Sequence, residues 1–164
     1  MKCFSGSEIW TKKWQDEMNE MGDEATNILI NEYPQYDLIK LSHWNPGYDI
    51  IFNRYEIKIE VKRRYDSPSV DITKTQWDNS DIISMYDEIK VGYHMLTSDY
   101  RKIVKEKDNK SCVFKLSKKS SKYAVIPQSL FRKFPQTTKD LSDLIEPMIK
   151  ERQPRILISD FMAA

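Results

Sequence analysis

Residues 48–64 read YDIIFNRYEIKIEVKRR, and this stretch decides the fold class. From Tyr55 onward, apolar residues alternate with charged ones, which is the period of a β-strand with one buried face, so a strand is expected over 55–64. The run at 48–52 also has strand character, and only Asn53 and Arg54 separate the two runs. Because asparagine tolerates a positive φ, the sequence predicts a tight β-hairpin with a two-residue loop.

The predicted hairpin gathers charged side chains on one face. With a two-residue loop, Asp49 pairs with Lys58, and residues two apart on a strand share a face. Four charged residues therefore emerge together: Asp49, Lys58, Glu60 and Lys62. Asp49 and Glu60 become diagonal neighbours, roughly 7–8 Å apart at Cα. Carboxylate oxygens from both residues suit a hard divalent cation, with Lys62 next to it on the same face.

Two carboxylates and a lysine on one face supply what hydrolysis of a phosphodiester needs. A metal ion activates a water and neutralises charge on the phosphate, while a lysine holds the water or stabilises the transition state. The same alternation is typical of a solvent-facing strand with cross-strand ion pairs, of which Asp49–Lys58 is an example. Alternation alone leaves both interpretations open.

The rest of the chain predicts an α/β or α+β domain with one mixed sheet flanked by helices. A helical pattern runs over 8–33, with Gly22 as a point where it breaks into two helices, and Pro34 ends it. Further strands are expected at 37–42, 111–116 and 123–126, and helices at 71–86, 127–134 and 138–152, the last interrupted by Pro147. The segment 88–108 stays open between a strand at VGYHML and a helix at YRKIVKEK.

Asp49, ten intervening residues and then Glu60-Val61-Lys62 resemble the D-(x)n-E-x-K signature of the PD-(D/E)XK, or restriction-endonuclease-like, nuclease superfamily. The resemblance implies that Asp49 and Glu60 bind Mg²⁺, for which Mn²⁺ substitutes. It also implies that the backbone carbonyl of Val61 is a further metal ligand and that Lys62 is the catalytic lysine.

The resemblance extends over about residues 20–134. The GDE at 22–24 is similar to the superfamily's first helix, whose glutamate, here Glu24, points toward the site. The DITKTQW at 71–77 looks like the helix after the E-x-K strand, which implies that Gln76 reaches the active site. YAVIPQ at 123–128 resembles the closing strand and turn of restriction-type and junction-resolving members. Tyr48 departs from the pattern, which has proline before the aspartate. One domain is expected, with its core at 20–134 and a helical extension at 135–164.

Basic residues are unevenly distributed along the chain. The net charge is +1, yet residues 101–122 hold nine lysines and arginines against two acidic residues. Such a stripe attracts polyanions, although a solvated lysine-rich loop has the same composition. The residues expected to contact nucleic-acid phosphates are Arg63, Arg64, Lys74, Lys115, Lys118, Lys119 and Lys122.

Several classes are excluded or disfavoured by composition. No apolar run approaches the ~20 residues of a spanning helix, the first residues do not resemble an export signal, and a cytoplasmic location without membrane contact is expected. Four glycines form no phosphate-binding loop, so no nucleotide cofactor is expected. The two histidines lack partners at zinc spacing.

The sequence thus predicts a Mg²⁺-dependent DNA endonuclease of restriction type or junction-resolving type. Cutting both strands of a duplex would need two copies, so a homodimer is expected. One alternative is a non-catalytic nucleic-acid-binding module that retains the nuclease fold, and another is an unrelated α+β interaction domain whose charged strand is merely solvated.

Overall fold

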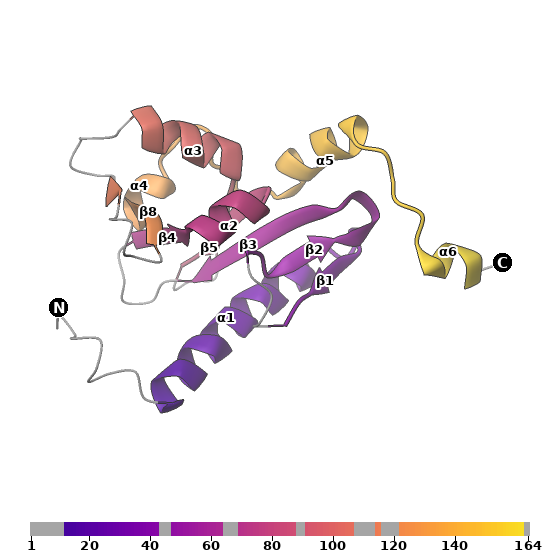
Figure 1. Ribbon diagram of the computed structural model, residues 1–164, viewed down its shortest axis with the longest axis horizontal. Coiled ribbons are helices and arrows are strands. Elements are labelled where there is room, and N and C mark those ends of the chain that lie inside the picture. Colours follow the sequence, from indigo (N-terminus) through magenta and orange to yellow (C-terminus); the bar gives the residue numbers. More distant parts are fainter. Residues whose placement is uncertain are drawn as a thin grey trace.

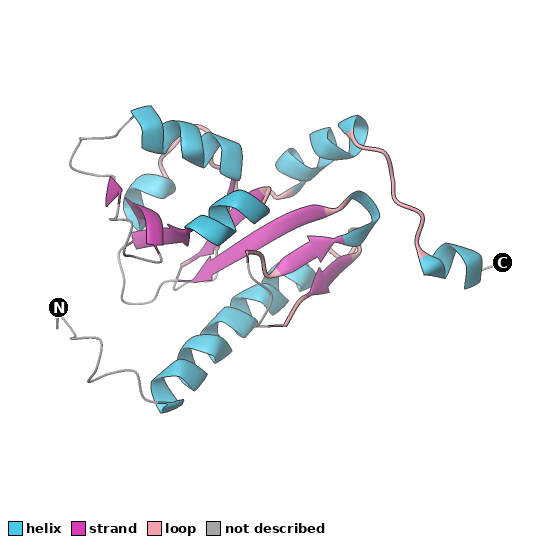
Figure 2. Ribbon diagram, viewed as in Figure 1, coloured by secondary structure: helices cyan, strands magenta, loops and turns pink. Residues whose placement is uncertain are grey.

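The computed structural model describes residues 12–42, 47–63, 69–87, 91–106, 114–115 and 122–162. Within these ranges a five-stranded mixed sheet is flanked by helices (Figure 1, Figure 2). Its strand order is β1-β2-β3-β5-β6; β3 and β5 are parallel neighbours, and the other pairs are antiparallel. The strands are β1 (Leu38–Lys40), β2 (Ile50–Phe52), β3 (Ile57–Arg63), β5 (Ile82–Tyr86) and β6 (Gly92–Leu96). This arrangement confirms the predicted mixed α/β class.

A smaller antiparallel sheet accompanies the central one, so the prediction of a single sheet is wrong. Its strand order is β4-β8-β7, from β4 (Ser69–Thr73), β7 (Phe114–Lys115) and β8 (Lys122–Pro127). The helices are α1 (Lys12–Glu32), α2 (Lys74–Asn79), α3 (Thr97–Glu106), α4 (Gln128–Phe131), α5 (Ser142–Glu151) and α6 (Ile158–Met162). Residues 92–106, left open by the sequence, thus form a strand followed by a helix.

The predicted helix over 71–86 is wrong, because this segment contains the end of β4, the short helix α2 and the central strand β5. Every residue of β5 is buried. Ile82 and Tyr86 belong to one apolar core, and Ile83 and Met85 belong to another on the opposite face of the sheet. A strand that is buried on both faces shows no polar alternation, so its apolar run is easily taken for part of a helix.

Gly22 does not break the first helix, as the sequence had suggested. α1 continues through it, and the Thr26 hydroxyl donates to the Gly22 carbonyl at 2.8 Å. A glycine inside a helix costs about 1 kcal/mol relative to alanine, which a helix packed against a sheet tolerates.

Two apolar cores lie on the two faces of the central sheet. The first joins α1 and α5 to the sheet and contains, among others, Ala25, Leu29, Ile57, Ile59, Val61, Leu141 and Ile145. The second joins α2, α3, α4 and the small sheet to β5 and β6 and contains, among others, Ile72, Trp77, Met95, Tyr100, Ile103 and Phe131. Because Leu141 and Ile145 are fully buried, α5 and the residue before it belong to the core.

One face of β3 packs into the first core, and the opposite, polar face is part of neither core. Ile57, Ile59 and Val61 enter the first core, and the second core as described contains no residue of β3. The intervening residues Lys58, Glu60 and Lys62 point to the face that α2 approaches, as alternation along a strand requires.

The β2–β3 hairpin has a longer loop than predicted. Phe52 pairs with Ile57 and Ile50 with Ile59, so the loop consists of a short 3₁₀ helix over Asn53–Tyr55 followed by Glu56 in the left-handed region at φ 55°. The two-residue loop and its register are therefore wrong. The error is a shift of two residues, and an even shift leaves every side chain on its predicted face.

After α5 the chain continues through residues 152–157 into α6 and lies along the hairpin loop. Arg54 binds both carboxylate oxygens of Asp160, at 2.6 and 2.7 Å. Four apolar side chains of this segment, at positions 156, 158, 161 and 162, are 75–80% exposed. Among the described helices, none has the length and apolar character to cross a membrane.

Candidate active site

Asp49 lies just before β2 and is fixed by the backbone of β3. One of its carboxylate oxygens, Oδ2, accepts the N–H of Val61 at 2.8 Å, and its own N–H donates to the carbonyl of Ile59 at 2.9 Å. Continuing the observed register by one pair brings Asp49 opposite Glu60, where the sequence had placed Lys58. The two carboxyl groups lie close enough for a hydrogen bond between their side chains.

Glu60 and Lys62 form a buried pair on the polar face of β3. The side-chain nitrogen of Lys62 lies 3.4 Å from Oε1 of Glu60. Glu60 is only 4% exposed and Lys62 only 9%. This burial contradicts the interpretation of the strand as merely solvated, since charged side chains are rarely buried unless they are paired.

Gln76 joins these two residues from α2. Its Oε1 accepts from the Lys62 ammonium at 2.8 Å, and its Nε2 donates to Oε1 of Glu60 at 2.9 Å. The structure thus brings four of the sequence-predicted residues together: Asp49, Glu60, Lys62 and Gln76.

A capping box at the start of α2 aims Gln76 into the cluster. The Thr73 hydroxyl accepts the N–H of Gln76 at 3.2 Å, and Gln76 Oε1 accepts the N–H of Thr73 at 3.0 Å. The sequence interpretation missed Thr73, although the spacing Thr-x-x-Gln signals the start of a helix.

The electrostatics of the cluster centre on Glu60. Burial raises the pKa of Glu60 to about 8; the charge of Lys62 opposes this rise, while the charge of Asp49 and a hydrogen bond with it add to it. With this pKa, and with a second carboxyl beside it, Glu60 is mostly protonated at neutral pH, because its surroundings supply too little positive charge to stabilise the ionised form. A bound cation would supply that charge.

This donor set fits a magnesium-type ion. Mg²⁺ is held in proteins by one or two carboxylates, with waters and substrate oxygens completing its shell. Among the described residues no group of three or more His, Cys, Asp or Glu side chains gathers in a way that could hold a metal, so the site offers two carboxylates and whatever backbone oxygen joins them. The carbonyl of Val61 remains the predicted third ligand.

Lys58 makes no ion pair with Asp49 among the described contacts. Its ammonium instead lies over the ring of Tyr48, 5.3 Å from the ring centre. The cross-strand pair Asp49–Lys58, which the solvated-strand interpretation offered as an example, is therefore wrong.

Glu24 and Arg63 pair with each other at 2.7 Å. Arg63 follows Lys62 along β3 and so points to the opposite, α1-facing side of the sheet. Its side chain is only 3% exposed, which leaves little of it for a phosphate. The structure therefore places Glu24 at this ion pair, and its role in the site stays a prediction.

The remaining residues predicted to bind nucleic acid are only partly visible. Lys74 is exposed at the first position of α2. Arg64, Lys118 and Lys119 lie outside the described residues, as do the side chains of Lys115 and Lys122. Their contacts with nucleic acid stay predictions.

Comparisons with known proteins include a distant structural likeness. No protein-family model matches the chain, and no curated protein matches it. A solved structure of a bacterial homing endonuclease, I-Ssp6803I, is similar over 51% of this chain and 72% of its own, with 20% sequence identity and a TM-score of 0.42. A likeness this distant does not establish function, for which the geometry of the site is the evidence.

Proposed function

We propose that this protein is a metal-dependent endonuclease that hydrolyses phosphodiester bonds in DNA. The observation that carries the proposal is the buried cluster in which Gln76 joins Glu60 to Lys62, with the Asp49 carboxyl beside Glu60. A buried carboxylate with a raised pKa next to a specific charge partner is a common mark of a functional site.

Asp49 and Glu60 would hold Mg²⁺ or Mn²⁺, with the carbonyl of Val61 as a further ligand. When bound, the ion supplies a water of lowered pKa and positive charge beside the phosphate. Glu60 gains most from it, because its ionised form is otherwise disfavoured by burial.

Lys62 supplies a fixed positive charge for the phosphate. Its ammonium has three donors, of which one is directed to Gln76 Oε1 and another faces Glu60 Oε1, so the third is left to meet an anionic oxygen. Gln76 and the burial of Lys62 restrict where that charge lies. A fixed charge in a poorly hydrated site stabilises a transition state more strongly than a mobile one in water.

Cutting both strands of a duplex would require two copies of the site, so we propose that the active form is a homodimer. Light scattering of the purified chain tests this directly: a mass near 39 kDa supports a dimer, and a mass near the 19.5 kDa of one chain contradicts it.

The activity is tested on supercoiled plasmid and on a four-way junction, each with Mg²⁺ or Mn²⁺ and with a chelator. Restriction-type action predicts plasmid linearisation, and junction-resolving action predicts cutting of the junction alone. Glu60→Gln and Lys62→Met are expected to lower the cleavage rate by about 10²-fold or more. The exposed Lys133→Met is the matched control and should cut normally.

Unchanged cutting by both site variants would overturn the proposal. Metal-independent, salt-sensitive DNA binding without any cutting would favour the non-catalytic binding module. Titration calorimetry with Mn²⁺ on the wild type and on Asp49→Asn gives a second readout: no heat of binding in the wild type contradicts the metal site.

A further inference from the structure

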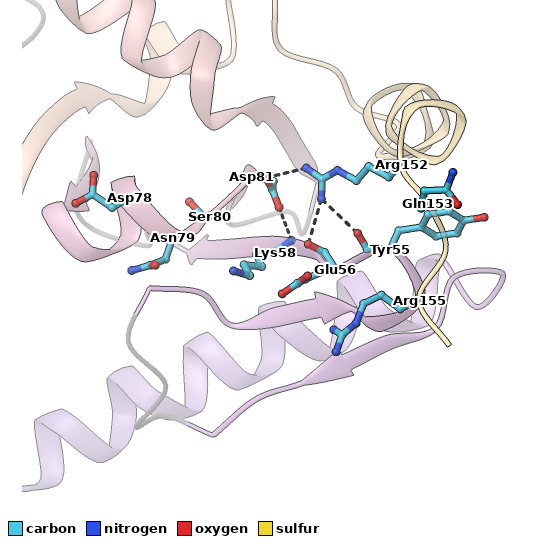
Figure 3. Close-up of a pocket in the computed structure, with 10 residues that line it drawn as sticks. All are labelled: Tyr55, Glu56, Lys58, Asp78, Asn79, Ser80, Asp81, Arg152, Gln153 and Arg155. Atoms are coloured by element: carbon cyan, nitrogen blue, oxygen red, sulfur yellow. Dashed lines mark hydrogen bonds and ion pairs between the residues drawn. The ribbon is translucent and has the colours of Figure 1, made fainter. Parts of the chain in front are cut away.

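A polar depression adjoins the candidate active site along the same face of β3. It has a volume of about 510 Å³ and is formed by three segments: residues 55–58 across the start of β3, residues 78–81 across the end of α2, and residues 152–155 after α5 (Figure 3). This volume lies within the range of ligand sites.

Two elements connect this depression to the site. Lys58 lies two residues before Glu60 on the same face of β3, a separation of about 6–7 Å along a strand. α2 carries Gln76 at the candidate site and ends at Asn79, which lines the depression. The row Lys58, Glu60, Lys62 therefore places a cation on each side of the proposed metal ligand.

Several charges in the depression are already neutralised by one another. The Arg152 guanidinium donates to Oδ1 of Asp81 at 3.0 Å and to the carbonyl of Glu56 at 3.1 Å (Figure 3). Asp81 Oδ2 accepts the backbone N–H of Lys58 at 2.9 Å. Asp78 lies 3.9 Å from Arg101. Arg152 and Asp81 thus hold the three segments together.

Two cations remain available to a ligand. The Lys58 ammonium lies over the Tyr48 ring and has no carboxylate partner among the residues that the structure describes. The exposed Arg155 reaches only the amide oxygen of Asn53, at 3.4 Å, and it too has no ion pair within the described ranges. Glu56 opposes them with one negative charge, so the free charge in the depression is positive.

We propose that this depression binds a backbone phosphate of the DNA, next to the phosphate that is cut, through Lys58 and Arg155. The inference rests on the proposed function, since it takes the substrate to be a polynucleotide that runs along β3. A contact of this kind fixes the register of the strand without reading its sequence.

The test measures binding of a short labelled duplex without metal, across a series of salt concentrations, so that no cutting is needed. Each phosphate contact that is lost lowers the salt dependence by a slope of about 0.9 and the affinity by roughly three- to tenfold. Lys58→Met and Arg155→Gln should each show this loss. Lys58→Arg should retain both affinity and slope.

Lys139→Met is the matched control, because Lys139 also lies over a tyrosine ring, that of Tyr93, at 5.8 Å. It should bind as the wild type does. Arg155 lies outside the sheet and is exposed, so its variant tests the inference even if Lys58→Met unfolds. Wild-type affinity and salt slope in a folded Lys58→Met and in Arg155→Gln would overturn the inference.

The two proposals fail separately. If Lys62→Met loses cutting while Lys58→Met binds DNA normally, the endonuclease proposal is supported and the phosphate-site proposal is contradicted. If the wild type never cuts yet loses affinity on Lys58→Met, the phosphate site stands and the endonuclease falls.

Discussion

Gln76 decides whether Lys62 and Glu60 act as one unit. Its amide presents an acceptor to the ammonium and a donor to the carboxylate, 2.8 and 2.9 Å away. A single amide can do both only in one orientation, and the Thr73 N–H, which also donates to Oε1, selects that orientation. Replacing the amide therefore disturbs the position of two charges at once.

We expect Gln76→Ala to leave Lys62 and Glu60 without their amide partner. Because both are buried, the loss should lower the free energy of unfolding by about 1–3 kcal/mol. The cleavage rate should fall together with it, which single-turnover kinetics and urea unfolding measure. Thr75→Ala, an exposed position on the same helix, is the control and should change neither. Full activity of Gln76→Ala would show that Lys62 is positioned by other contacts.

His94 makes the stability of the fold depend on pH. The ring is fully buried, it pairs with the Ser84 hydroxyl at 2.7 Å, and it lies edge-on to Tyr33 and Tyr86. Burial lowers the pKa of His94 to about 4 from 6.5, with Asp140 opposing the shift. The unfolded chain therefore binds a proton at a higher pH than the folded one does, and acid favours unfolding.

The contribution of neutral His94 to the free energy of unfolding is fully present above about pH 6.5 and is lost as the pH falls toward 4. At about pH 4.5 the loss should reach about 2–3 kcal/mol relative to about pH 7.5. Urea unfolding at both pH values measures it. In His94→Gln, which retains a polar partner for Ser84, the difference between the two pH values should shrink by that amount. An unchanged difference would assign the acid sensitivity to carboxylates.

At the scale of elements, β3 was predictable because one of its faces is apolar and the other charged. The alternation of Ile57, Ile59 and Val61 with charged residues gave the strand and the shared face of Glu60 and Lys62. The hairpin loop was not predictable, because Glu56 adopts a left-handed conformation that glutamate rarely takes. Asp49, Glu60 and Lys62 still share one face of the sheet, because the predicted register was wrong by two residues and an even shift preserves the face.

The strands β5 and β4 could not be predicted from local pattern, whereas β7 and β8 fall at the strands expected over 111–116 and 123–126. The run Ile82–Tyr86 is buried on both faces, so its sequence carries no alternation. β4 pairs with β8, whose partner residues lie 49–58 positions later, and such a long-range partner leaves no signal in a short window. The approach of Gln76 to the site depends on this arrangement, because β4 ends at the residue that precedes α2 and so fixes where α2 begins.

The capping box links the stability of α2 to the activity of the site. We expect Thr73→Ala to lower the free energy of unfolding by about 1 kcal/mol, as loss of an N-cap does. It should also lower the cleavage rate, because Gln76 loses one of its two ties to Thr73. Thr73→Ser keeps the hydroxyl and should restore both. Restored stability without restored cleavage would separate the cap from the site.

At the scale of the whole molecule, Arg54 ties the chain after α5 back to the β2–β3 hairpin. Its guanidinium binds both oxygens of Asp160 and the carbonyl of Arg155, and the Arg155 N–H donates to the Arg54 carbonyl. α6 has no buried residue, so these polar contacts, and not a core, hold it.

Asp160→Asn should therefore release residues 156–162 without destabilising the core, which hydrogen exchange by mass spectrometry resolves. The Arg54 hydrogen bonds lower the pKa of Asp160 to about 2 from 3.8. The Arg54–Asp160 ion pair is therefore complete above pH 3.8 and is lost only as the pH falls through about 2. At neutral pH it should weaken as salt is added. Arg155 directly precedes residues 156–162, and its carbonyl accepts from the same Arg54 guanidinium. If Arg155 binds a DNA phosphate, Asp160→Asn should lower the affinity for DNA as Arg155→Gln does. Faster amide exchange at unchanged DNA affinity would show that the Arg155–phosphate contact does not depend on the Arg54–Asp160 ion pair.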